Sequence, residues 1–364
     1  MRAAVLRGYK EPFAIEDVEL APPETGEVEV RIEAVGICHT DATAREGGKP
    51  VPLPIVLGHE GAGVVERVGP GVTSVKPGDR VVIAMLAVCG HCRFCVQGIP
   101  GLCRVGGPVL FQGTMLDKTT RLSRGGQPIH HFFAQSSFAE RAVVPEGSVA
   151  VVPNDAPLDI VSILACGAST GISSVLNTAA VPPGASVVII GAGGVGLSAV
   201  LAAKLAGADP IVVVDVVPQK LGWAKELGAT VVINAKDQDP IPAILQHTGG
   251  GADYAFEFVG SEVTLTQLVQ SIGVGGKGFM IGAGPLGTRF TIDANAFLPG
   301  KQLQGVMGGF MRPKIDIPRF VRLFQSGRLP LDRLVTRRLG LEEINEGFDA
   351  LARGEVIRSV IVMR

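Results

Sequence analysis

A glycine-rich turn in the second half of the chain constrains the fold more than any other feature of the sequence. The apolar run 186–190 leads directly into Gly191-Ala192-Gly193-Gly194-Val195-Gly196, and a helical pattern follows. In this spacing the first glycine permits a tight turn, the second lets a pyrophosphate approach the backbone, and the third allows close packing of helix on strand. The helix start also offers free N–H groups to phosphates. The segment therefore predicts a strand–turn–helix unit that binds a dinucleotide.

An acidic residue favours one dinucleotide over the other. Asp215 follows the next apolar run, 19 positions after Gly196, and Val216 and Val217 come after it. A carboxylate at this place binds the 2′-hydroxyl of the adenosine ribose and repels a 2′-phosphate. Because no arginine follows that could accommodate such a phosphate, the sequence favours NAD over NADP. A doubly wound domain that binds another nucleotide remains an alternative.

The rest of the chain divides around this unit. From about residue 168, apolar runs at 186–190, 211–214 and 231–233 alternate with helical patterns at 195–205 and 220–227, which is typical of a parallel α/β sheet. Before residue 150, alternating runs at 28–35, 61–69 and 79–83 lie between turns and predict a β-rich domain. After residue 307 we expect helices at 317–325 and 341–353 and a last strand at 359–363. The sequence thus predicts an α/β protein with one domain formed by residues 1–167 and 308–364 and an inserted domain formed by residues 168–307.

Composition excludes several classes of protein. Of 364 residues, 46% are hydrophobic, and the 33 basic and 34 acidic residues leave a net charge of −1. No basic run is present, so capture of nucleic acid or of an anionic membrane by charge is not expected. Residues 1–7 are broken by charge too early for a signal peptide, and no long apolar stretch predicts a membrane span. We therefore expect a cytoplasmic protein with a small-molecule partner.

Four of the six cysteines crowd into one short segment. Cys89, Cys92, Cys95 and Cys103 occupy 15 positions. Without an export signal a disulfide framework is not expected, and clustered thiolates are the ligands of a closed tetrahedral zinc site. The spacing therefore predicts a structural zinc. Four cysteines can also hold an iron–sulfur cluster, which stays open at this point.

The remaining cysteines fit a second kind of metal site. Cys38, His59 and Cys166 would supply three ligands and leave a fourth position open, as catalytic zinc requires. Glu60, beside His59, could act as an outer or transient ligand, and Asp41 could orient the His59 ring. The alternative is that the two cysteines are buried as small apolar residues and that His59 is a loop residue.

Several of these motifs together resemble a known family. Gly58-His59-Glu60-Gly61-Ala62-Gly63-Val64-Val65, the 89–103 segment and the 191–196 turn resemble the zinc-containing alcohol dehydrogenases of the medium-chain dehydrogenase/reductase superfamily. Residues 105–131 are similar to the longer loop of the animal and glutathione-dependent branch of this family. Residues 52–54 and 132–138 are similar to bacterial aryl- and terpene-alcohol dehydrogenases. The resemblance implies a GroES-like catalytic domain and a Rossmann domain that binds NAD. It also implies two zinc ions per chain and a homodimer formed through the Rossmann domain, with a tetramer as the alternative.

The resemblance also implies roles for individual residues. Thr40 would bind the hydroxyl of a zinc-bound alcohol and pass on its proton. The cofactor would be contacted by His39 and Arg358 at the pyrophosphate, Thr170 near the nicotinamide and Lys220 near the adenosine ribose. The substrate channel would be lined by Met85, Leu102, Pro108 and Phe132. We expect reversible oxidation of a medium-sized apolar primary alcohol, aromatic or aliphatic.

Two departures from the family pattern leave alternatives open. Thr43 stands where animal members place the histidine that ends the proton relay. The acidic residues and the arginine that hold a glutathione adduct in the glutathione-dependent branch are also missing around residues 48–52 and 105–107. Their absence argues against oxidation of S-(hydroxymethyl)glutathione, which is therefore only the second candidate activity. A structural protein that binds zinc and nucleotide on the same fold is the non-enzymatic alternative.

Overall fold

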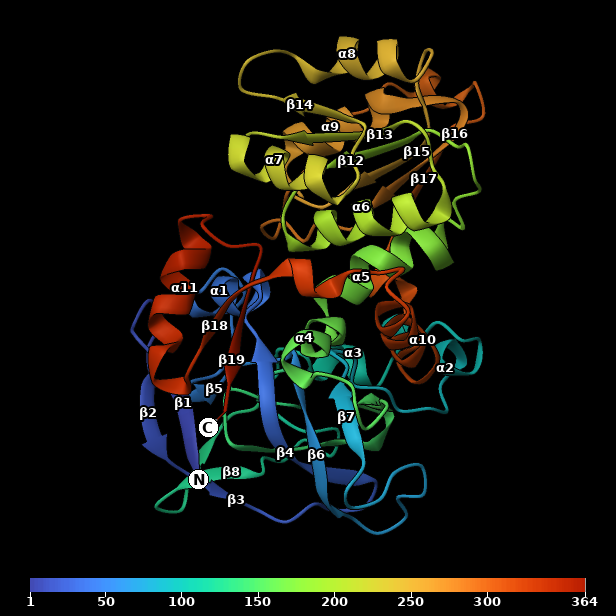
Figure 1. The fold of residues 1–364 in the computed structure, drawn as a ribbon. Coiled ribbons are helices and arrows are strands. Elements are labelled where there is room, and N and C mark those ends of the chain that lie inside the picture. The colour runs from blue at the N-terminus through green and yellow to red at the C-terminus, as the bar shows by residue number, and fades with distance from the viewer. Residues whose placement is uncertain (364) are drawn as a thin grey trace. The chain divides into compact units, whose positions relative to one another are not determined.

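The computed structural model describes residues 1–363, and within them the chain forms two compact units (Figure 1). The discontinuous unit comprises Met1–Cys166 and the described part of Arg312–Arg364. The inserted unit comprises Gly167–Met311. The sequence placed the ends of the insertion at residues 168 and 307.

The inserted unit is built on a parallel sheet. Within residues 187–305 its six strands run in the order β14 (Val231–Asn234), β13 (Ile211–Asp215), β12 (Val187–Ile190), β15 (Ala252–Glu257), β16 (Ile272–Met280) and β17 (Gln302–Gly305). The central strands are continuous apolar runs because helices cover both faces, and Val188, Val212 and Ala255 are fully buried. The strand order reverses between β12 and β15, which is the switch point where doubly wound sheets bind their ligands.

One helix precedes the strands of this sheet, and the others connect them. The helices are α5 (Gly167–Ser173), α6 (Gly194–Ala206), α7 (Pro218–Leu227), α8 (Pro240–His247) and α9 (Glu262–Ser271). α6 begins at its N-cap Gly193 and ends where Gly207 adopts φ 78°, a left-handed conformation that glycine tolerates best. This strand–turn–helix unit confirms the Rossmann-type domain that the glycine spacing predicts.

The discontinuous unit is mainly antiparallel. Its largest sheet has the order β11 (Val149–Val151), β7 (Arg80–Ile83), β6 (Gly61–Val68), β4 (Glu27–Gly36), β19 (Arg358–Val362) and β18 (Val335–Leu339), and β10 (Arg141–Pro145) also pairs with β4. Smaller sheets join β1 (Arg2–Leu6) to β2 (Ala14–Asp17) and β5 (Ile55–Val56), and β8 (Leu122–Arg124) to β3 (Glu19–Leu20) and β9 (Gln127–Ile129). Because β19 pairs with β4, the last strand of the chain returns to the sheet begun by the first part.

Helices of this unit differ in detail from the expected ones. α10 spans Pro313–Gln325, so it begins before the expected residue 317, and it contains Pro318. Its buried face, with Ile317, Phe320 and Val321, explains why tertiary packing overrides the proline signal. α11 spans Ile344–Ala352 after a short 3₁₀ turn at Leu341–Glu343. Other short helices are α1 (His39–Arg45), α2 (Arg93–Val96), α3 (Gly106–Val109) and α4 (Leu158–Val161).

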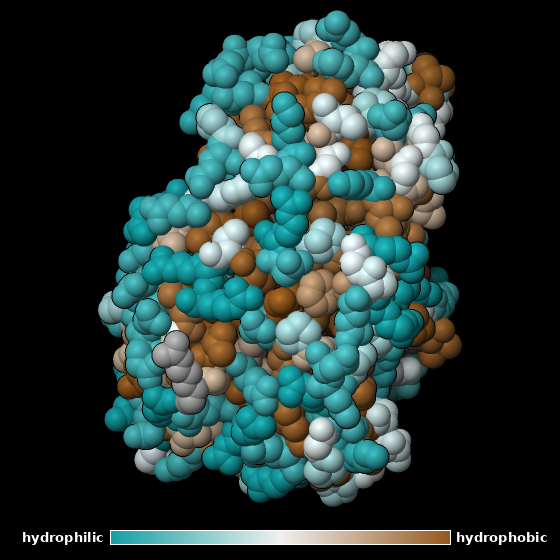
Figure 2. All heavy atoms as spheres, in the orientation of Figure 1, coloured by the Kyte–Doolittle hydropathy of each residue, from teal (hydrophilic) through white to brown (hydrophobic). Residues whose placement is uncertain are grey.

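No single helix within residues 1–363 is long and apolar enough to cross a bilayer; the helical stretches Leu158–Ala165 and Gly167–Thr178 pass together by length and composition only. Apart from residues 159, 160 and 176–178, which are partly exposed, the residues of that pair are buried, as in the core of a folded protein. Figure 2 shows a face that is mostly hydrophilic, with scattered hydrophobic side chains between the polar ones. Single exposed apolar residues of this kind are normal on protein surfaces.

Candidate functional site

Four potential ligands converge inside the discontinuous unit. Cys38, His59, Glu60 and Cys166 each offer one donor atom, and these atoms lie within 4.8 Å of one another. We call this set the buried cluster, since its most exposed member, Cys166, has only 8% of its surface accessible. Cys38 immediately precedes α1, His59 and Glu60 immediately precede β6, and Cys166 ends a 3₁₀ turn. The fold therefore brings together ligands from three distant segments.

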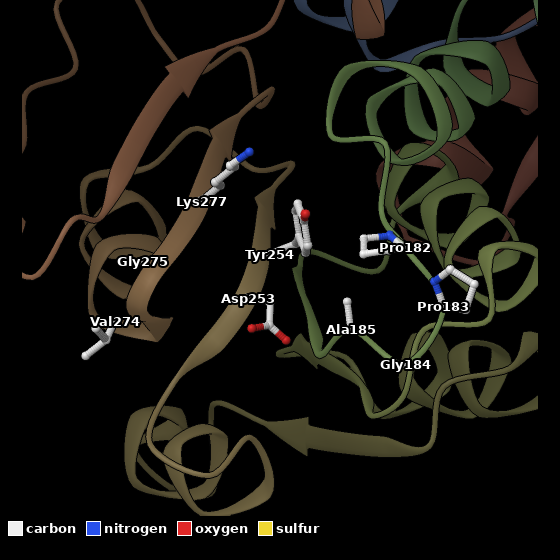
Figure 3. A pocket seen from close by; sticks show the side chains of 9 residues that line it. All are labelled: Pro182, Pro183, Gly184, Ala185, Asp253, Tyr254, Val274, Gly275 and Lys277. Carbon is white, nitrogen blue, oxygen red and sulfur yellow. The ribbon is translucent and has the colours of Figure 1, made fainter.

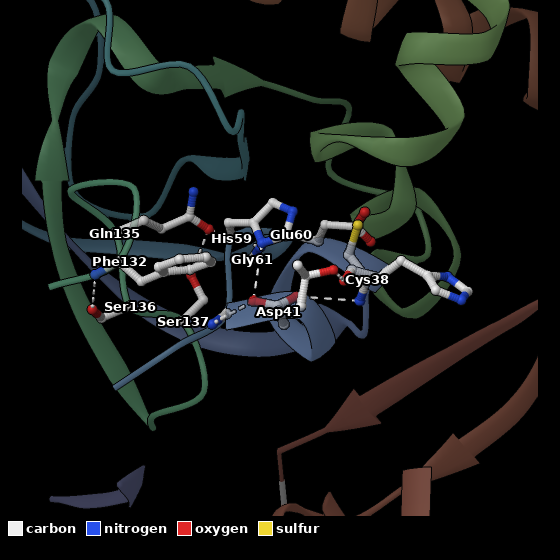
Figure 4. Close-up of polar contacts among 12 residues, drawn as sticks. Cys38, Asp41, His59, Glu60, Gly61, Phe132, Gln135, Ser136 and Ser137 are labelled. Atoms are coloured by element: carbon white, nitrogen blue, oxygen red, sulfur yellow. Dashed lines mark hydrogen bonds and ion pairs between the residues drawn. The ribbon is translucent and has the colours of Figure 1, made fainter. Parts of the chain in front are cut away.

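A buried carboxylate orients the histidine of the cluster. Asp41 Oδ1 lies 3.0 Å from His59 Nδ1 and also accepts a hydrogen bond from Gly58 N–H, while Oδ2 accepts one from Cys38 N–H (Figure 4). Asp41 and His59 are both fully buried. The carboxylate therefore holds the imidazole proton on Nδ1 and leaves a lone pair on Nε2. Among residues 1–363, His59 Nε2 has no hydrogen-bond partner.

The pKa values of the ionisable groups in and beside the buried cluster are shifted because these groups lie close together and away from water. Burial alone would lower the pKa of His59, but the charges of Asp41 and Cys38 raise it well above its usual value, so Nε2 carries a proton unless a metal ion takes its lone pair. A hydrogen bond from Cys166 lowers the pKa of Cys38 well below that of a free thiol. Burial raises the pKa of Asp41 and of Glu60. Groups of this kind, removed from water, require protons or a cation to balance them.

The donor set fits a zinc ion. Thiolate sulfur and imidazole nitrogen are preferred zinc ligands, and both structural and catalytic zinc sites use them. The unpartnered His59 Nε2 is the observation that decides this, because a fully buried acceptor without a donor is costly unless it has a ligand to bind. Asp41 supplies the outer contact that metal-binding histidines usually have.

Arg358 pairs with the carboxylate of the cluster. It opens β19, is 4% exposed, and forms a buried ion pair with Glu60. Burial opposes the charge of Arg358, while the Glu60 carboxylate raises its pKa. The sequence assigned Arg358 to a pyrophosphate, and the structure shows a second contact that the sequence did not suggest. His39, assigned the same ligand, is the exposed first residue of α1.

Aromatic side chains pack against the buried histidine. The Phe133 ring stacks on His59 with centroids 4.6 Å apart, and Phe132 meets it edge-on at 5.7 Å. Phe111 contacts both phenylalanines, and the amine of Lys49 lies 5.2 Å from the Phe111 centroid. Sequence reasoning identified Phe132 but missed the other three. The double phenylalanine at 132–133 was the available signal.

The loop of residues 132–137, which carries Phe132 and Phe133, is under backbone strain. Phe133, Ala134 and Ser136 all have positive φ, which side-chain-bearing residues rarely adopt. Polar contacts hold it: buried Gln135 Oε1 accepts from Gly61 N–H and from Ser137 Oγ, and Ser136 Oγ donates to Val56 O (Figure 4). Strained loops of this kind persist where the surroundings fix them, and they concentrate at functional sites.

The other residues assigned to a substrate channel lie in two places. Met85 is buried and its N–H donates to Ala165 O, directly before Cys166. Leu102 and Pro108 are exposed residues on either side of Cys103. Thr40, in the first turn of α1, is partly exposed, and Thr43 Oγ1 donates to the His39 carbonyl.

The second set of cysteines forms a separate cluster, the four-cysteine loop, made of Cys89, Cys92, Cys95 and Cys103. Its donor atoms also lie within 4.8 Å of one another. Three sulfur–sulfur distances are 3.9, 3.5 and 4.0 Å, and no cysteine within residues 1–363 forms a disulfide. Tetrahedral zinc with bonds of about 2.3 Å separates its sulfurs by about 3.8 Å, so the geometry fits that ion. Hydrogen bonds led by the Cys95 N–H lower the pKa of Cys92 to about 6.

The glycine turn of the inserted unit has the backbone that its spacing predicts. Gly191 has φ 96°, and a Cβ on Gly196 would lie 1.9 Å from the Gly191 carbonyl oxygen. A Cβ on Gly193, by contrast, would meet no atom within 4 Å. Packing therefore explains Gly191 and Gly196, whereas the open space over Gly193 fits the approach of a phosphate. Gly194 and Val195 begin α6.

The remaining cofactor candidates also lie in the inserted unit. Asp215 ends β13, where Oδ2 accepts from Ala192 N–H and Oδ1 from Val216 and Val217 N–H. The carboxylate thus braces the glycine turn and keeps lone pairs for a ligand hydroxyl. Lys220 lies on α7, and Thr170 is a buried residue of α5.

A pocket of about 370 Å³ lies on another edge of this sheet (Figure 3). It is lined by Pro182–Ala185 before β12, by Asp253 and Tyr254 in β15, and by Val274, Gly275 and Lys277 in β16. These residues precede or begin their strands. The pocket is therefore at the amino ends of the sheet and is distinct from the glycine turn at the carboxyl ends.

Comparison with known proteins places this geometry in a family. Residues 24–154 match the alcohol dehydrogenase GroES-like domain, and residues 194–326 match the zinc-binding dehydrogenase domain. An alcohol dehydrogenase zinc-binding domain protein from Burkholderia ambifaria is 43% identical with a TM-score of 0.97, covering 100% of this chain and 98% of its own. Benzyl alcohol dehydrogenase from Acinetobacter calcoaceticus is 40% identical with a TM-score of 0.96, covering 100% and 99%. An alcohol dehydrogenase from a Thermus species is 30% identical with a TM-score of 0.85, covering 100% of both chains.

The two domains and the matched relatives define a zinc-binding oxidoreductase fold. The chain belongs to the zinc-containing alcohol dehydrogenase family of the medium-chain dehydrogenase/reductases. The resemblance that the motifs indicated and the predicted combination of a GroES-like domain with a Rossmann-type domain are confirmed.

Proposed function

We propose that the protein is an NAD-dependent alcohol dehydrogenase that oxidises medium-sized apolar primary alcohols, aromatic ones included, in a reversible reaction. The observation that carries this proposal is the buried cluster, in which His59 Nε2 is fully buried and unpartnered among the described residues. A protein that kept this fold for a purely structural purpose would have no need of such an arrangement of Cys38, His59, Glu60 and Cys166.

Cys38, His59 and Cys166 would hold a catalytic zinc, and Glu60 would be an outer or transient ligand. The four-cysteine loop would hold a second, structural zinc. When bound, the catalytic zinc lowers the pKa of an alcohol hydroxyl and NAD accepts the hydride from the alcohol carbon. Asp41 orients His59 for this task, and the buried ion pair with Arg358 limits the free negative charge of Glu60.

Aromatic packing supports the choice of substrate. Phe132 and Phe133 cover His59, and Phe111 extends this apolar surface outward. An apolar wall excludes water from the reacting group and favours a hydrophobic alcohol. One of the similar structures is a benzyl alcohol dehydrogenase, which agrees with an aromatic substrate here. Met85, Leu102 and Pro108 remain candidates for the same channel.

We assign proton transfer to Thr40. Its hydroxyl lies on α1 two residues after Cys38, is partly exposed and can receive the proton of an alcohol. Thr43 Oγ1 is bonded to the His39 carbonyl and cannot titrate as a histidine would. We therefore infer that the proton released by Thr40 passes to water.

The cofactor assignment rests on the glycine turn and on Asp215. Gly191, Gly193, Gly194, Val195 and Gly196 would receive the pyrophosphate, together with His39 and Arg358. Asp215 and Lys220 would bind the adenosine ribose, and Thr170 would lie near the nicotinamide. The charge of Asp215 disfavours a 2′-phosphate, so we propose NAD as the preferred cofactor.

We further propose a cytoplasmic homodimer formed through the inserted unit, with a tetramer as the alternative. The thiols of both clusters must stay reduced to bind zinc, which a reducing compartment ensures. β17, whose residues are mostly exposed, stands at the edge of the parallel sheet and offers unpaired backbone groups to a second copy.

The test is reduction of NAD by the purified protein with benzyl alcohol, a series of linear alcohols, and formaldehyde with glutathione. We expect turnover with benzyl alcohol, no requirement for glutathione, weaker use of NADP, and two zinc ions per chain by elemental analysis. Turnover that depends on glutathione would replace the proposed substrate. Absence of turnover with every alcohol in a protein that holds both zinc ions would contradict the enzymatic assignment.

A further inference from the structure

A buried acidic residue outside the predicted site lies beside the glycine turn. Glu257 is the last residue of β15 and is fully buried. In the sheet it stands level with Ile190, directly before Gly191, and on its other side with Met280, at the end of β16. Burying a carboxylate is costly, and Oε2 of Glu257 has no hydrogen-bond partner among residues 1–363. Because burial of this carboxylate destabilises the fold, we looked to its contacts for a functional role.

The rest of Glu257 organises two loops. Its Oε1 accepts hydrogen bonds of 2.7 and 2.6 Å from the N–H groups of Val259 and Gly260. Its main-chain carbonyl accepts 2.9 Å bonds from the N–H groups of Ile281 and Gly282. One residue therefore fixes both the loop after β15 and the loop after β16, by side chain and by backbone.

These two loops touch each other and the glycine turn. A Cβ on Gly260 would lie 2.3 Å from Gly284 N, and one on Gly282 would lie 2.3 Å from Gly260 N, so the loops meet backbone to backbone. A Cβ on Gly191 would lie 2.7 Å from a methyl carbon of Val259. The position of the 258–260 loop consequently sets the surface beside Gly191.

The sheet order tells which part of a dinucleotide these loops would face. The adenosine half of a dinucleotide binds on the side of β12 and β13, where Asp215 lies, and the other half lies across the switch point. β15 and β16 are on that other side. Their carboxyl-end loops therefore face the nicotinamide half, if NAD binds as proposed above.

We propose that Glu257 is a positioning residue for the nicotinamide half of the cofactor. Its carboxylate holds the 258–260 loop in one arrangement through charged hydrogen bonds to the N–H groups of Val259 and Gly260, which are stronger than neutral ones. The 282–284 loop, bonded to the Glu257 main-chain carbonyl, packs against the loop so fixed. This role rests on the proposed use of NAD, but it concerns the inserted unit alone and does not depend on zinc or on the alcohol.

The test compares two ligands on the zinc-loaded protein. NADH contains the nicotinamide half, whereas ADP-ribose lacks the nicotinamide ring and retains the adenosine half. Binding of NADH is followed by its fluorescence, and binding of ADP-ribose by its competition with NADH. In Glu257→Gln the amide keeps one acceptor oxygen but loses the charge and replaces the other oxygen, which has no hydrogen-bond partner among residues 1–363, with an NH₂ group. We expect about 10-fold or greater weakening of NADH, the usual effect of losing a hydrogen bond to a charged group, and less than about 2-fold change for ADP-ribose.

Two further variants make the test specific. Glu262→Gln removes the same charge from the exposed first turn of α9 and should leave both affinities unchanged. Gly260→Ala disturbs the contact of the two loops without touching the carboxylate, since its φ of 84° and its 2.3 Å approach to Gly284 exclude a Cβ. It should reproduce the selective loss of NADH, also when Glu257→Gln fails to fold.

Equal weakening of NADH and ADP-ribose would overturn the proposal, because it would indicate general loosening of the domain. Unchanged NADH affinity in both Glu257→Gln and Gly260→Ala would overturn it as well. Failure of the wild-type protein to bind NADH is a different result: it would contradict the proposed cofactor and not the role of Glu257 in fixing the loops.

Discussion

The two metal-ligand clusters of the discontinuous unit are built in opposite ways. The four-cysteine loop takes all its donors from 15 consecutive positions, and three of its four cysteines are partly exposed. The buried cluster takes its donors from three segments, the last of which, at Cys166, lies more than 100 residues after the first two, and every donor is buried. The first cluster organises a short loop around itself, whereas the second depends on a fold already formed.

The two architectures predict different roles for the two metal ions. A site that gathers flexible residues gains its stability from the metal, because the binding free energy is also folding free energy. A site held by β6, α1 and their hydrogen bonds is organised before the metal arrives, so its metal serves chemistry. The same cysteine-to-serine change should therefore have different consequences in the two clusters.

The largest effect is expected from Cys166→Ser in the buried cluster. A serine keeps the size of the side chain but is a poor zinc ligand, so one zinc per chain should be lost and kcat with benzyl alcohol should fall by about 10³–10⁴-fold. The free energy of unfolding should change little. Zinc analysis, turnover and urea denaturation on one preparation check this. Retained turnover would remove Cys166 from the site.

The matched change in the four-cysteine loop is Cys92→Ser, for which we expect lower stability. Loss of one thiolate from a closed site should reduce the free energy of unfolding by on the order of 3–5 kcal/mol and free the loop for proteolysis. Turnover per folded molecule should stay near that of the wild type. If Cys92→Ser instead lost activity at unchanged stability, the two clusters would have the opposite roles.

The contrast between the clusters also explains what the sequence could predict. The four-cysteine loop is a local pattern, so its spacing alone indicated the ligands. For the buried cluster, no local spacing relates Cys38, His59 and Cys166. Their residue types suggested a three-ligand zinc site, and a purely structural interpretation of the three residues stayed open. Asp41 could be suggested because it lies three residues after Cys38, at the place where it caps α1.

Other parts of the site depend on tertiary contacts that no local pattern encodes. The Glu60–Arg358 pair joins residues 298 positions apart and forms because β19 pairs with β4. Phe111, Lys49 and Glu257 have unremarkable neighbours in sequence and acquire their contacts only in the folded chain. Apolar periodicity predicted such elements as β4, β6, β12, α6 and α7 close to their observed bounds, but it predicted none of the elements between residues 235 and 306.

A smaller effect is expected for Asp41→Asn, which tests whether the buried cluster is organised before metal binds. The carboxylate accepts hydrogen bonds from three groups, which an amide cannot do with the same geometry. Loss of an outer contact of this kind typically lowers metal affinity or activity by about 10–100-fold. Zinc competition with a chromophoric chelator measures it. Asp79→Asn, in a turn where the carboxylate accepts from Lys76 N–H, is the control and should leave zinc affinity unchanged.

The smallest expected effect is a pH-dependent change in stability caused by a second buried histidine. Comparison with this residue shows why a metal is assigned to His59. His131 is 1% exposed, and its Nδ1 also has no partner within residues 1–363. Its Nε2, however, accepts a hydrogen bond from Arg121 N–H, so in the neutral ring the proton is on Nδ1 and no lone pair is offered. An unpartnered nitrogen therefore indicates a metal ligand only where the other nitrogen donates, as in His59.

This assignment makes His131 a neutral residue whose effect on stability depends on pH. Burial, followed by the charge of Arg121, lowers its pKa to about 3, while the unfolded chain should titrate near the usual value of about 6.5. Between these values the unfolded state binds more protons, so the free energy of unfolding must fall as pH decreases from about 6.5 toward 3. The contribution of one histidine reaches about 1.4 kcal/mol per pH unit.

His131→Gln, whose side-chain oxygen can still accept a hydrogen bond from Arg121 N–H, should remove this pH-dependent contribution. Urea denaturation of both proteins between pH 5 and 8 should give a difference in stability that is constant above about pH 7 and shifts in favour of the variant below pH 6. Parallel curves would mean that His131 titrates alike in the folded and unfolded states, and that its tautomer cannot serve as the contrast to His59.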